Sequence, residues 1–359
     1  MHDLTVIGAG PVGSYLASLC AARMSVQVLE RKRIPGGKAC SGLVSGRLKD
    51  ILPGHIVQTP GLIQHSVKGA RIHFLGEELE LRKKGTAAYV IDRDLLDKRL
   101  AEHAESLGCD MRFGTSVRHV SVKPDRIRLG AGKASFESKM AAGCGGAYSV
   151  AARHIGARPP ELLSGIVMLA EQEDRSDCVE LWYNKRKATG GFLWRIPRGH
   201  QTEYGAMGTG VTIAGVGRFF GLGKMKLAGK AAAPIPIGLV RTYAARLLLA
   251  GDEACQTKPW SGGGVTYGLL AAQQASRVIG KAVEQDDFTE AMLSKYEEGW
   301  KKILYRDMQA GLVLRELYKD LEGSELSRIM HNLDSMKGLQ GRMDFDFPFS
   351  RMLGGSLGA

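Results

Sequence analysis

The stretch Leu4-Thr-Val-Ile-Gly8-Ala-Gly10-Pro-Val-Gly13 decides the fold of this chain. Its first four residues predict a short buried strand, and residues 11–22 carry apolar side chains at helical spacing. A second strand is predicted over residues 26–29, and Glu30 follows it directly. The order strand, glycine turn, helix, strand is typical of the opening of a parallel α/β fold.

The glycines of this turn have the spacing GxGxxG, which suits a dinucleotide. Gly8 permits the tight turn, Gly10 lets a pyrophosphate approach the backbone, and Gly13 allows close packing of helix on strand. The pyrophosphate would lie at the helix N-terminus, where free N–H groups favour anions. Glu30 would accept hydrogen bonds from ribose hydroxyls. A plain tight turn is the alternative, and the motif alone does not separate FAD from NAD.

Composition and charge narrow the classes of protein. The chain has 359 residues, 44% hydrophobic and 24% charged, which excludes wholesale disorder and fibrous proteins. Its net charge of +12 predicts attraction to phosphates, nucleic acid or a lipid surface. The six cysteines include no CxxC pair, which argues against a zinc ribbon and favours a reducing compartment. No run of about 18 apolar residues and no targeting segment is present, so a protein that is soluble or lies on a membrane surface is expected.

A second motif distinguishes between the cofactors. Leu247-Leu-Leu-Ala-Gly251-Asp252 predicts a strand ending in Gly-Asp, and Pro259-Trp-Ser-Gly262-Gly-Gly264 precedes a helix from Val265. These segments resemble the GD…P…GxG segment of the FAD-dependent hydroxylase-like superfamily. The resemblance implies that Asp252 holds the ribityl chain and that the helix points at the isoalloxazine ring. A helix N-terminus there would stabilise the negative charge of reduced flavin. Alternatively, Asp252 only caps its own turn.

Three further positions match that superfamily. Arg93 corresponds to its arginine at a helix start beside FAD, and Val117 to the position whose backbone flanks the adenine. Gly143-Cys-Gly-Gly-Ala-Tyr-Ser149 resembles its GADGxxS segment, which helps to arrange FAD and NADPH. Gly145 stands where the superfamily has aspartate, and this departure weakens the expectation of an NADPH site.

Two stretches resemble the geranylgeranyl reductase branch, which includes the archaeal digeranylgeranylglycerophospholipid reductases. Lys38-Ala-Cys40-Ser-Gly42-Leu-Val-Ser resembles their cysteine loop, and Gly191-Phe192-Leu-Trp194-Arg-Ile196-Pro197 resembles their YxWxFP signature. The resemblance implies that Cys40 faces flavin and substrate. Lys38, and a short helix predicted near residues 43–52, would favour its thiolate. The alternatives are a cysteine packed as a small hydrophobe and aromatic residues that only fill a sheet core.

The resemblance implies a Rossmann-like FAD-binding domain of the hydroxylase-like, glutathione-reductase type. Residues 1–60, 88–160 and 240–285 would form this discontinuous domain. An interleaved antiparallel-sheet substrate domain would comprise residues 61–87 and 161–239, followed by a helical C-terminal region over 286–359 to which no motif assigns a role.

The candidate site residues follow from the motifs and the resemblance. Predicted FAD contacts are Gly8, Gly10, Val12, Gly13, Glu30, Arg31, Cys40, Ser41, Gly42, Arg93, Val117, Gly251, Asp252, Gly262, Gly263, Gly264 and Val265. The substrate would lie against Phe192, Trp194, Pro197 and Trp260. Cys40 is the candidate catalytic residue, Tyr267 is a second conceivable proton donor, and no metal ligand is predicted.

The function expected from the resemblance is FAD-dependent saturation of C=C bonds in geranylgeranyl chains of isoprenoid ether lipids or their precursors. The alternatives are a single-component FAD-dependent monooxygenase of the aromatic hydroxylase type and a non-catalytic binding protein on the same scaffold. Because no second GxGxxG occurs, the electron donor, NAD(P)H or reduced ferredoxin, is expected to dock transiently.

Residues 218–230 predict a membrane-facing segment. Basic side chains, Lys224 and Lys226 among them, alternate there with apolar ones such as Phe219 and Phe220, and no acidic residue intervenes. A solvated loop face is the alternative, and no nucleic-acid module is present. A cytoplasmic protein bound peripherally to the anionic inner face of the cell membrane is therefore expected.

Overall fold

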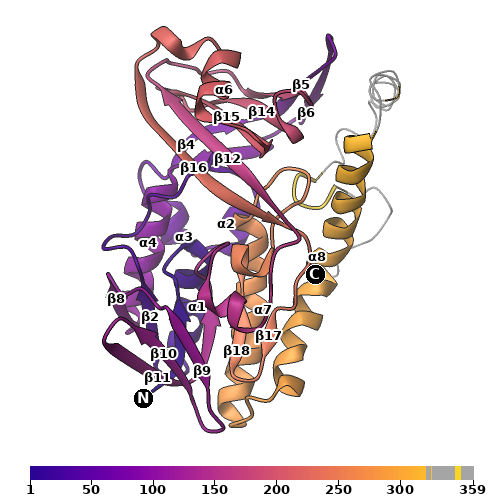
Figure 1. Cartoon of the computed structure of the whole chain (residues 1–359). Coiled ribbons are helices and arrows are strands. Elements are labelled where there is room, and N and C mark those ends of the chain that lie inside the picture. Colours follow the sequence, from indigo (N-terminus) through magenta and orange to yellow (C-terminus); the bar gives the residue numbers. More distant parts are fainter. Residues whose placement is uncertain (321–324, 326–343, 349–359) are drawn as a thin grey trace.

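A parallel sheet forms the lower half of the molecule (Figure 1). The computed structural model describes residues 1–320, 325 and 344–348. Strand β1 (His2–Ile7) lies between β11 (Ala134–Gly143) and β2 (Val26–Glu30), and all three run parallel. The sheet order is β17-β18-β11-β1-β2-β8, with β9 and β10 attached beside β11. The outer strands are β8 (Asp110–Phe113), β9 (His119–Val122), β10 (Ile127–Ala131), β17 (Tyr243–Ala244) and β18 (Leu247–Leu249).

Alternating side chains of this sheet build a core on each face. Leu4 and Val6 of β1 belong to the core shared with four helices, whereas Ile7 belongs to the core shared with β9, β10 and α5. The four helices are α1 (Pro11–Ala21), α4 (Arg93–Ser106), α7 (Val265–Glu284) and α8 (Glu290–Asp320); α5 spans Val150–His154. Helices on one face and a small antiparallel extension on the other bury the parallel strands from both sides.

A seven-stranded sheet forms the upper half (Figure 1). Its order is β16-β12-β15-β14-β13-β5-β6, and every neighbouring pair is antiparallel except β13 with β5. The strands are β5 (Gly69–Phe74), β6 (Glu77–Arg82), β12 (Glu161–Ala170), β13 (Cys178–Tyr183), β14 (Thr189–Pro197), β15 (Thr202–Thr209) and β16 (Leu227–Ile237). In the sequence, β5 and β6 come before α4 and before strands β8 to β11 of the parallel sheet, whereas β12 to β16 come after them. The seven-stranded sheet thus joins two separate segments of the chain.

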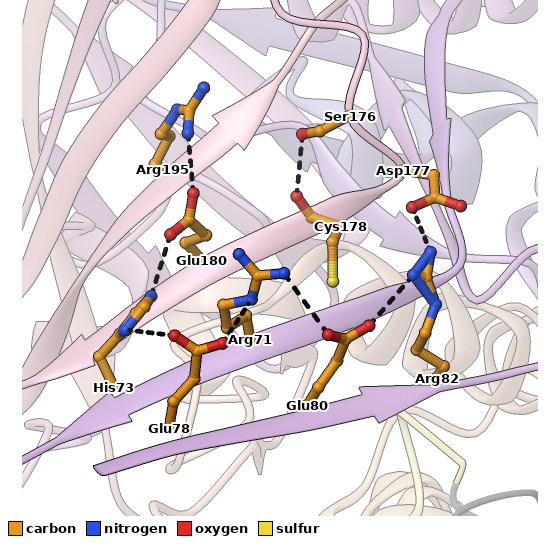
Figure 2. Close-up of polar contacts among 10 residues, drawn as sticks. All are labelled: Arg71, His73, Glu78, Glu80, Arg82, Ser176, Asp177, Cys178, Glu180 and Arg195. Carbon is orange, nitrogen blue, oxygen red and sulfur yellow. Dashed lines mark hydrogen bonds and ion pairs between the residues drawn. The ribbon is translucent and has the colours of Figure 1, made fainter.

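The outer face of this sheet carries a ladder of ion pairs (Figure 2). Glu180 accepts from Arg195 at 2.8 Å and contacts His73 at 2.9 Å, and Arg71 pairs with Glu78 at 2.9 Å. The ladder continues through Glu80, Arg82 and Asp177. Exposed pairs of this kind add little stability each. The ladder keeps the β5, β6 and β13 part of this face polar, whereas the part under α6 carries an apolar cluster that includes Leu193 and Tyr204.

A small sheet connects the two halves, and it corrects one prediction. The helix expected near residues 43–52 is instead strand β3 (Leu43–Ser45) followed by the one-turn helix α2 (Leu48–Ile51). Strand β3 pairs with β7 (Ala88–Ile91), which also pairs with β4 (Ile63–Val67); α3 spans Gly54–Val57. Pairing with β7 is a tertiary contact that outweighs the local helical pattern.

The apolar side chains of the basic segment pack partly inward. Residues 213–219 form α6 (Ile213–Phe219), followed by the 3-10 turn η1 (Leu222–Lys224). Phe219 and Phe220 make edge contacts with Trp182, and Leu222 is buried in the same cluster. Met225 and the lysines of the segment are exposed, so association of this segment with a membrane stays a prediction.

The mixed α/β fold with its parallel Rossmann sheet, antiparallel sheets and C-terminal helices confirms the predicted fold class. Of the C-terminal region, α8 and residues 344–348 are described; the rest of 321–359, apart from residue 325, lies outside the described residues. Among the described helices, none combines the length and apolarity needed to cross a bilayer.

Candidate functional site

One cavity of about 870 Å³ extends from the parallel sheet to the seven-stranded sheet. At its lower end it is bordered by the loops that follow β1, β2 and β18, and at its upper end by apolar side chains of β12, β13 and β14. We call the lower surface the glycine cradle, made by residues 9–12, Glu30, 251–252 and 262–265. The upper surface is the apolar wall, whose members are Val167, Val179, Leu181, Phe192, Trp194, Met207 and Ile235.

The first turn of the glycine cradle has the geometry that the GxGxxG spacing predicts. Gly8 has φ +104°, a conformation that favours glycine. A Cβ on Gly13 would lie 1.9 Å from the Gly8 carbonyl oxygen, so only glycine allows this approach of helix α1 to the strand. A Cβ on Gly10 would meet nothing within 4 Å, because Gly10 borders the cavity. Gly10 caps α1 without a side chain, and an anion can reach the first-turn N–H groups.

Glu30 is held at the end of β2 beside this turn. Its carboxylate accepts from the Ala9 N–H at 2.7 Å and from the Lys32 N–H at 2.8 Å. Both bonds fix the carboxylate at the cavity wall, where it keeps lone pairs for further donors. This is the arrangement that a ribose with two hydroxyl groups requires.

The second part of the cradle begins at η2 (Gly251–Ala254). Asp252 pairs with Lys38 of the loop after β2, and this carboxylate raises the pKa of Lys38 above its usual value. Gly251 and Gly262 have φ of +70° and +69°. A Cβ on Gly262 would lie 3.1 Å from Ile235, so the cradle meets the apolar wall at this glycine.

Cys40 lies at the cavity beside a buried arginine. Arg93 donates from Nη1 to the Cys40 Sγ at 3.1 Å and from Nη2 to Asp97 at 3.0 Å. Burial opposes the charge of Arg93, but Cys40 and Asp97 beside it raise its pKa above the usual value. Arg93 is the positive charge in direct contact with Cys40. Lys38 also acts on Cys40 through its charge, but it is paired with Asp252, and no helix starts directly after the cysteine.

Trp194 of the apolar wall is positioned by two partners that the sequence analysis missed. Its Nε1–H donates to Glu203 at 2.9 Å, and Arg198 pairs with the same carboxylate at 2.6 Å. Arg198 also donates to the Ser41 carbonyl oxygen at 2.7 Å, next to Cys40. Burial raises the pKa of Glu203 to about 6, against the effect of Arg198. A glutamate in an otherwise buried strand was the available signal for this network.

The C-terminal part of the chain also borders the cavity, although no motif indicated it. Leu314 of α8 and residues 344, 345 and 348 line the cavity. Asp346 is fully buried, accepts from Ser45, and pairs with Lys258 at 2.8 Å. Such contacts join residues about 300 positions apart, and no local pattern in the sequence marks them.

Most of the predicted site residues are brought together, and some are not. Of the predicted residues, those that line the cavity are Gly10, Val12, Glu30, Arg31, Cys40, Ser41, Arg93, Gly251, Asp252, Gly262, Gly263, Gly264, Val265, Phe192, Trp194 and Trp260. Those that do not are Gly8, Gly13, Gly42, Val117 and Pro197. Gly8, Gly13 and Gly42 act through backbone shape instead, since a Cβ on Gly42 would lie 2.2 Å from the Ile91 carbonyl oxygen.

Tyr267 is not available as a proton donor. Its side chain is fully buried, and its hydroxyl donates to the Asp346 carbonyl oxygen at 2.7 Å. Burial raises the pKa of this hydroxyl above its usual range. Tyr267 anchors residues 344–348, and Phe347 stacks on its ring at a centroid distance of 5.6 Å.

The cradle suits FAD, because an uncapped helix N-terminus, a fixed carboxylate and four further glycines line one cavity. Known proteins are similar to this chain over most of its length. The chain is 28% identical to digeranylgeranylglycerophospholipid reductase 1 of Methanococcoides burtonii, with 91% of this chain and 86% of that protein covered. It is 25% identical to the digeranylgeranylglycerophospholipid reductase of Methanosarcina acetivorans, with 94% and 89% covered.

A solved structure shares the fold. The geranylgeranyl bacteriochlorophyll reductase-like protein of Thermoplasma acidophilum superimposes with a TM-score of 0.84 at 21% identity, over 98% of this chain and 94% of that protein. The model of the FAD binding domain family matches residues 1–202, more than half of the chain. The chain therefore belongs to the FAD binding domain family and is a flavoprotein with FAD as its cofactor.

Proposed function

We propose that this flavoprotein is a reductase that saturates C=C bonds in the geranylgeranyl chains of isoprenoid ether lipids or their precursors. The observation that carries the proposal is the single cavity, in which the FAD cradle continues into the apolar wall without an intervening barrier. The two archaeal lipid reductases named above support the substrate class by their similarity over nine-tenths of this chain.

The apolar wall provides affinity for a long hydrocarbon. A polyprenyl chain offers no polar group along its length, so its binding energy comes from buried area, at about 25 cal/mol per Å². Phe192 and Trp194 present broad rings to the cavity, with centroids 5.8 Å apart. The hydrogen bond from Trp194 to Glu203 fixes one ring, which gives the chain a rigid surface and excludes water near the cradle.

Cys40 is the group best placed to supply a proton. Bound FAD, when reduced, supplies the hydride for one alkene carbon. An isolated alkene has no carbonyl oxygen to accept negative charge, so the other carbon needs a fixed acid. Cys40 lies at the cavity, and Arg93 donates to its sulfur at 3.1 Å. The guanidinium orients the thiol and stabilises the negative charge that remains on sulfur after the proton leaves.

Co-expression with a pathway that makes geranylgeranyl ether lipids tests the proposal. Mass spectrometry of the lipid extract should show two hydrogens added per reduced bond with the wild-type protein. Extracts from a Gly10→Val strain should show none, because its valine would occupy the space in the cradle at the helix N-terminus. Unchanged lipids with a flavin-loaded wild-type protein would reject the substrate class. Oxidation of NAD(P)H by O₂ in the presence of an aromatic acid, with a hydroxylated product, would favour the monooxygenase instead.

A further inference from the structure

Glu253 is a buried carboxylate that the proposed chemistry does not use. It follows Asp252 directly on η2, and only 3% of its surface is exposed. Among the described residues, no cation contacts it in an ion pair, although the charge of Arg153 acts on it. A buried carboxylate without a paired cation is costly, and hydrogen bonds must compensate it.

The hydrogen bonds of Glu253 come from a different motif. The Gly145 N–H donates to its Oε2 at 2.6 Å, and the Ala152 N–H donates to its Oε1 at 3.0 Å. Both donors belong to the segment that follows β11, about a hundred residues earlier in the chain. Hydrogen bonds from backbone N–H groups to a charged carboxylate are short and strong. The side chain therefore connects η2 with the 143–152 segment.

Glycines of that segment make room for the carboxylate. A Cβ on Gly143 would lie 2.5 Å from the Glu253 Oε1, which no substitution at Gly143 could avoid while Glu253 stays in place. A Cβ on Gly145 would lie 3.5 Å from Oε2 and 3.2 Å from the Ser149 Oγ. Gly145 has no positive φ, so its backbone would accept a side chain if the carboxylate of Glu253 were absent.

The two connected segments both border the FAD cavity. Residues 144–148 line it on one side, and Gly251 and Asp252 line it on another. Position 145 is also the place where the similar GADGxxS segment has its aspartate. Glu253 thus brings a carboxylate from η2 to position 145, where this chain has glycine and the similar segment has aspartate.

We propose that Glu253 is a positioning residue for the FAD site, whose carboxylate holds the turn at Gly145 against the Gly251–Asp252 turn in the geometry that FAD requires. Removal of the carboxylate would release the Gly145 and Ala152 N–H groups and let the 144–148 segment shift at the cavity. The proposal rests on FAD binding, which is the property of the FAD binding domain family. It does not depend on which substrate the protein reduces.

The test compares four proteins: wild type, Glu253→Ala, Gly145→Asp, and the double variant. FAD dissociation is followed on dilution of the holoprotein by the fluorescence of released flavin, and the visible circular dichroism of bound flavin reports its surroundings. Loss of hydrogen bonds to a charged group predicts FAD affinity about tenfold or more lower for Glu253→Ala. Gly145→Asp alone should also weaken binding, because two carboxylates would then share one buried site.

The double variant decides the question. Its carboxylate at position 145 fills the space that Glu253 leaves but belongs to the 143–152 segment, so it does not connect that segment with η2. FAD affinity and the dichroism band should therefore stay as far below wild type as in Glu253→Ala. Glu297→Gln is the matched control, since Glu297 also accepts from a backbone N–H, that of Thr242, away from the cavity. It should leave FAD affinity unchanged.

Two results would overturn the proposal. One is a double variant that binds FAD as tightly as wild type, which would show that a carboxylate near position 145 is enough and that the connection to η2 is not needed. The other is a Glu253→Ala protein with a lower unfolding temperature but wild-type FAD affinity, which would make Glu253 a general stabiliser of the fold. If Glu253→Ala does not fold, Glu253→Gln replaces it. Its amide keeps one acceptor for two N–H donors, and FAD affinity should then fall about threefold or more.

Discussion

The glycine cradle and the apolar wall border the same cavity but are built in opposite ways. In the cradle, backbone atoms form the surface, and side chains are missing wherever something must come close, as at Gly13. In the wall, extended strands carry large side chains into the cavity, and Trp194 lies where the facing Gly205 leaves space for its ring. The shape of the cradle depends on glycines that lack side chains, and the shape of the wall depends on large side chains.

This difference separates what the two surfaces can tolerate. A side chain added to the cradle meets backbone, which cannot move away, so the cradle changes only with loss of the cofactor or of the fold. A wall residue can be exchanged for another apolar one with repacking, and the shape of the cavity then changes gradually. We infer that substrate choice varies through the wall while FAD binding stays constant.

Two glycines of the GxGxxG turn should respond differently to substitution. Gly13→Ala places a Cβ 1.9 Å from a carbonyl oxygen and should lower the free energy of unfolding by about 3 kcal/mol or more. Gly10→Val has open space in the protein itself, so unfolding without flavin should be unchanged while FAD binding is lost. Denaturant titration and the flavin absorbance of the purified proteins measure both effects. A Gly10→Val protein with full flavin content would place the pyrophosphate elsewhere.

Cys40 marks the boundary between the two surfaces. Cys40→Ser should keep FAD, since the cradle is intact, but reduce alkene reduction by about a hundredfold because the acid is weaker. Cys178→Ser is the control, a partly exposed cysteine on the outer face of the seven-stranded sheet (Figure 2). Turnover of the two variants is compared at equal flavin content. Wild-type turnover by Cys40→Ser would return this cysteine to a packing role.

A buried glutamate packs next to each surface, and the two should make stability depend on pH over different ranges. Burial raises the pKa of Glu253, behind the cradle, to about 7, although Ser149, Gly145, Ala152 and Arg153 oppose the shift. Glu203, behind the wall, is raised to about 6. A raised pKa means that the folded state binds the proton more tightly, so stability is highest below pH 4.5, the usual pKa of a glutamate, and falls as pH rises.

The loss should extend to about pH 7 for Glu253 and about pH 6 for Glu203. The free energy of unfolding lost is on the order of 3 kcal/mol for Glu253 and on the order of 2 kcal/mol for Glu203. Unfolding free energies measured from pH 4 to 8 on Glu253→Gln and Glu203→Gln should each lack the corresponding part of the slope. A slope that both variants retain in full would assign the pH dependence to other groups.

The smallest effect concerns membrane association through the basic segment, which packs on the face of the seven-stranded sheet opposite the wall. Since Phe219 and Phe220 are packed against Trp182, we expect attraction to anionic lipid to be mainly electrostatic, at roughly 1 kcal/mol per basic side chain, with Met225 as the exposed large apolar side chain of the segment. Co-sedimentation with anionic vesicles should therefore fall with salt, and again when Lys224, Lys226 and Lys230 become Gln. Equal binding to neutral and anionic vesicles would contradict a charge-driven contact.

Local motifs made the cradle predictable. Gly8, Gly10, Gly13, Asp252 and their neighbours act through backbone geometry within a few residues, and such geometry leaves a short, recognisable pattern. The wall was predictable only through Phe192 and Trp194, because a strand's partners are set by pairing far along the chain.

Two of the contacts that were missed are long-range. Glu253 reaches Gly145 and Asp346 contacts Ser45, over 108 and 301 residues. Glu203 receives Trp194 and Arg198 from only nine and five residues away, where β14 pairs with β15 and no motif indicates the contact. The first part of the helix predicted at residues 43–52 was wrong, since only the pairing of β3 with β7 makes residues 43–45 a strand, whereas residues 48–51 are helical.

The parallel pairing of β5 with β13 has a consequence for how the chain acquires its structure. Strands β5 and β6 precede the middle of the parallel sheet in the sequence, yet they complete a sheet whose other strands begin at residue 161. The closing strand β18 of the parallel sheet comes later still. Neither half can therefore be completed on the ribosome before the other has begun. Folding must proceed as one late, cooperative event dominated by distant contacts, which is slow and leaves unpaired strand edges exposed until the end.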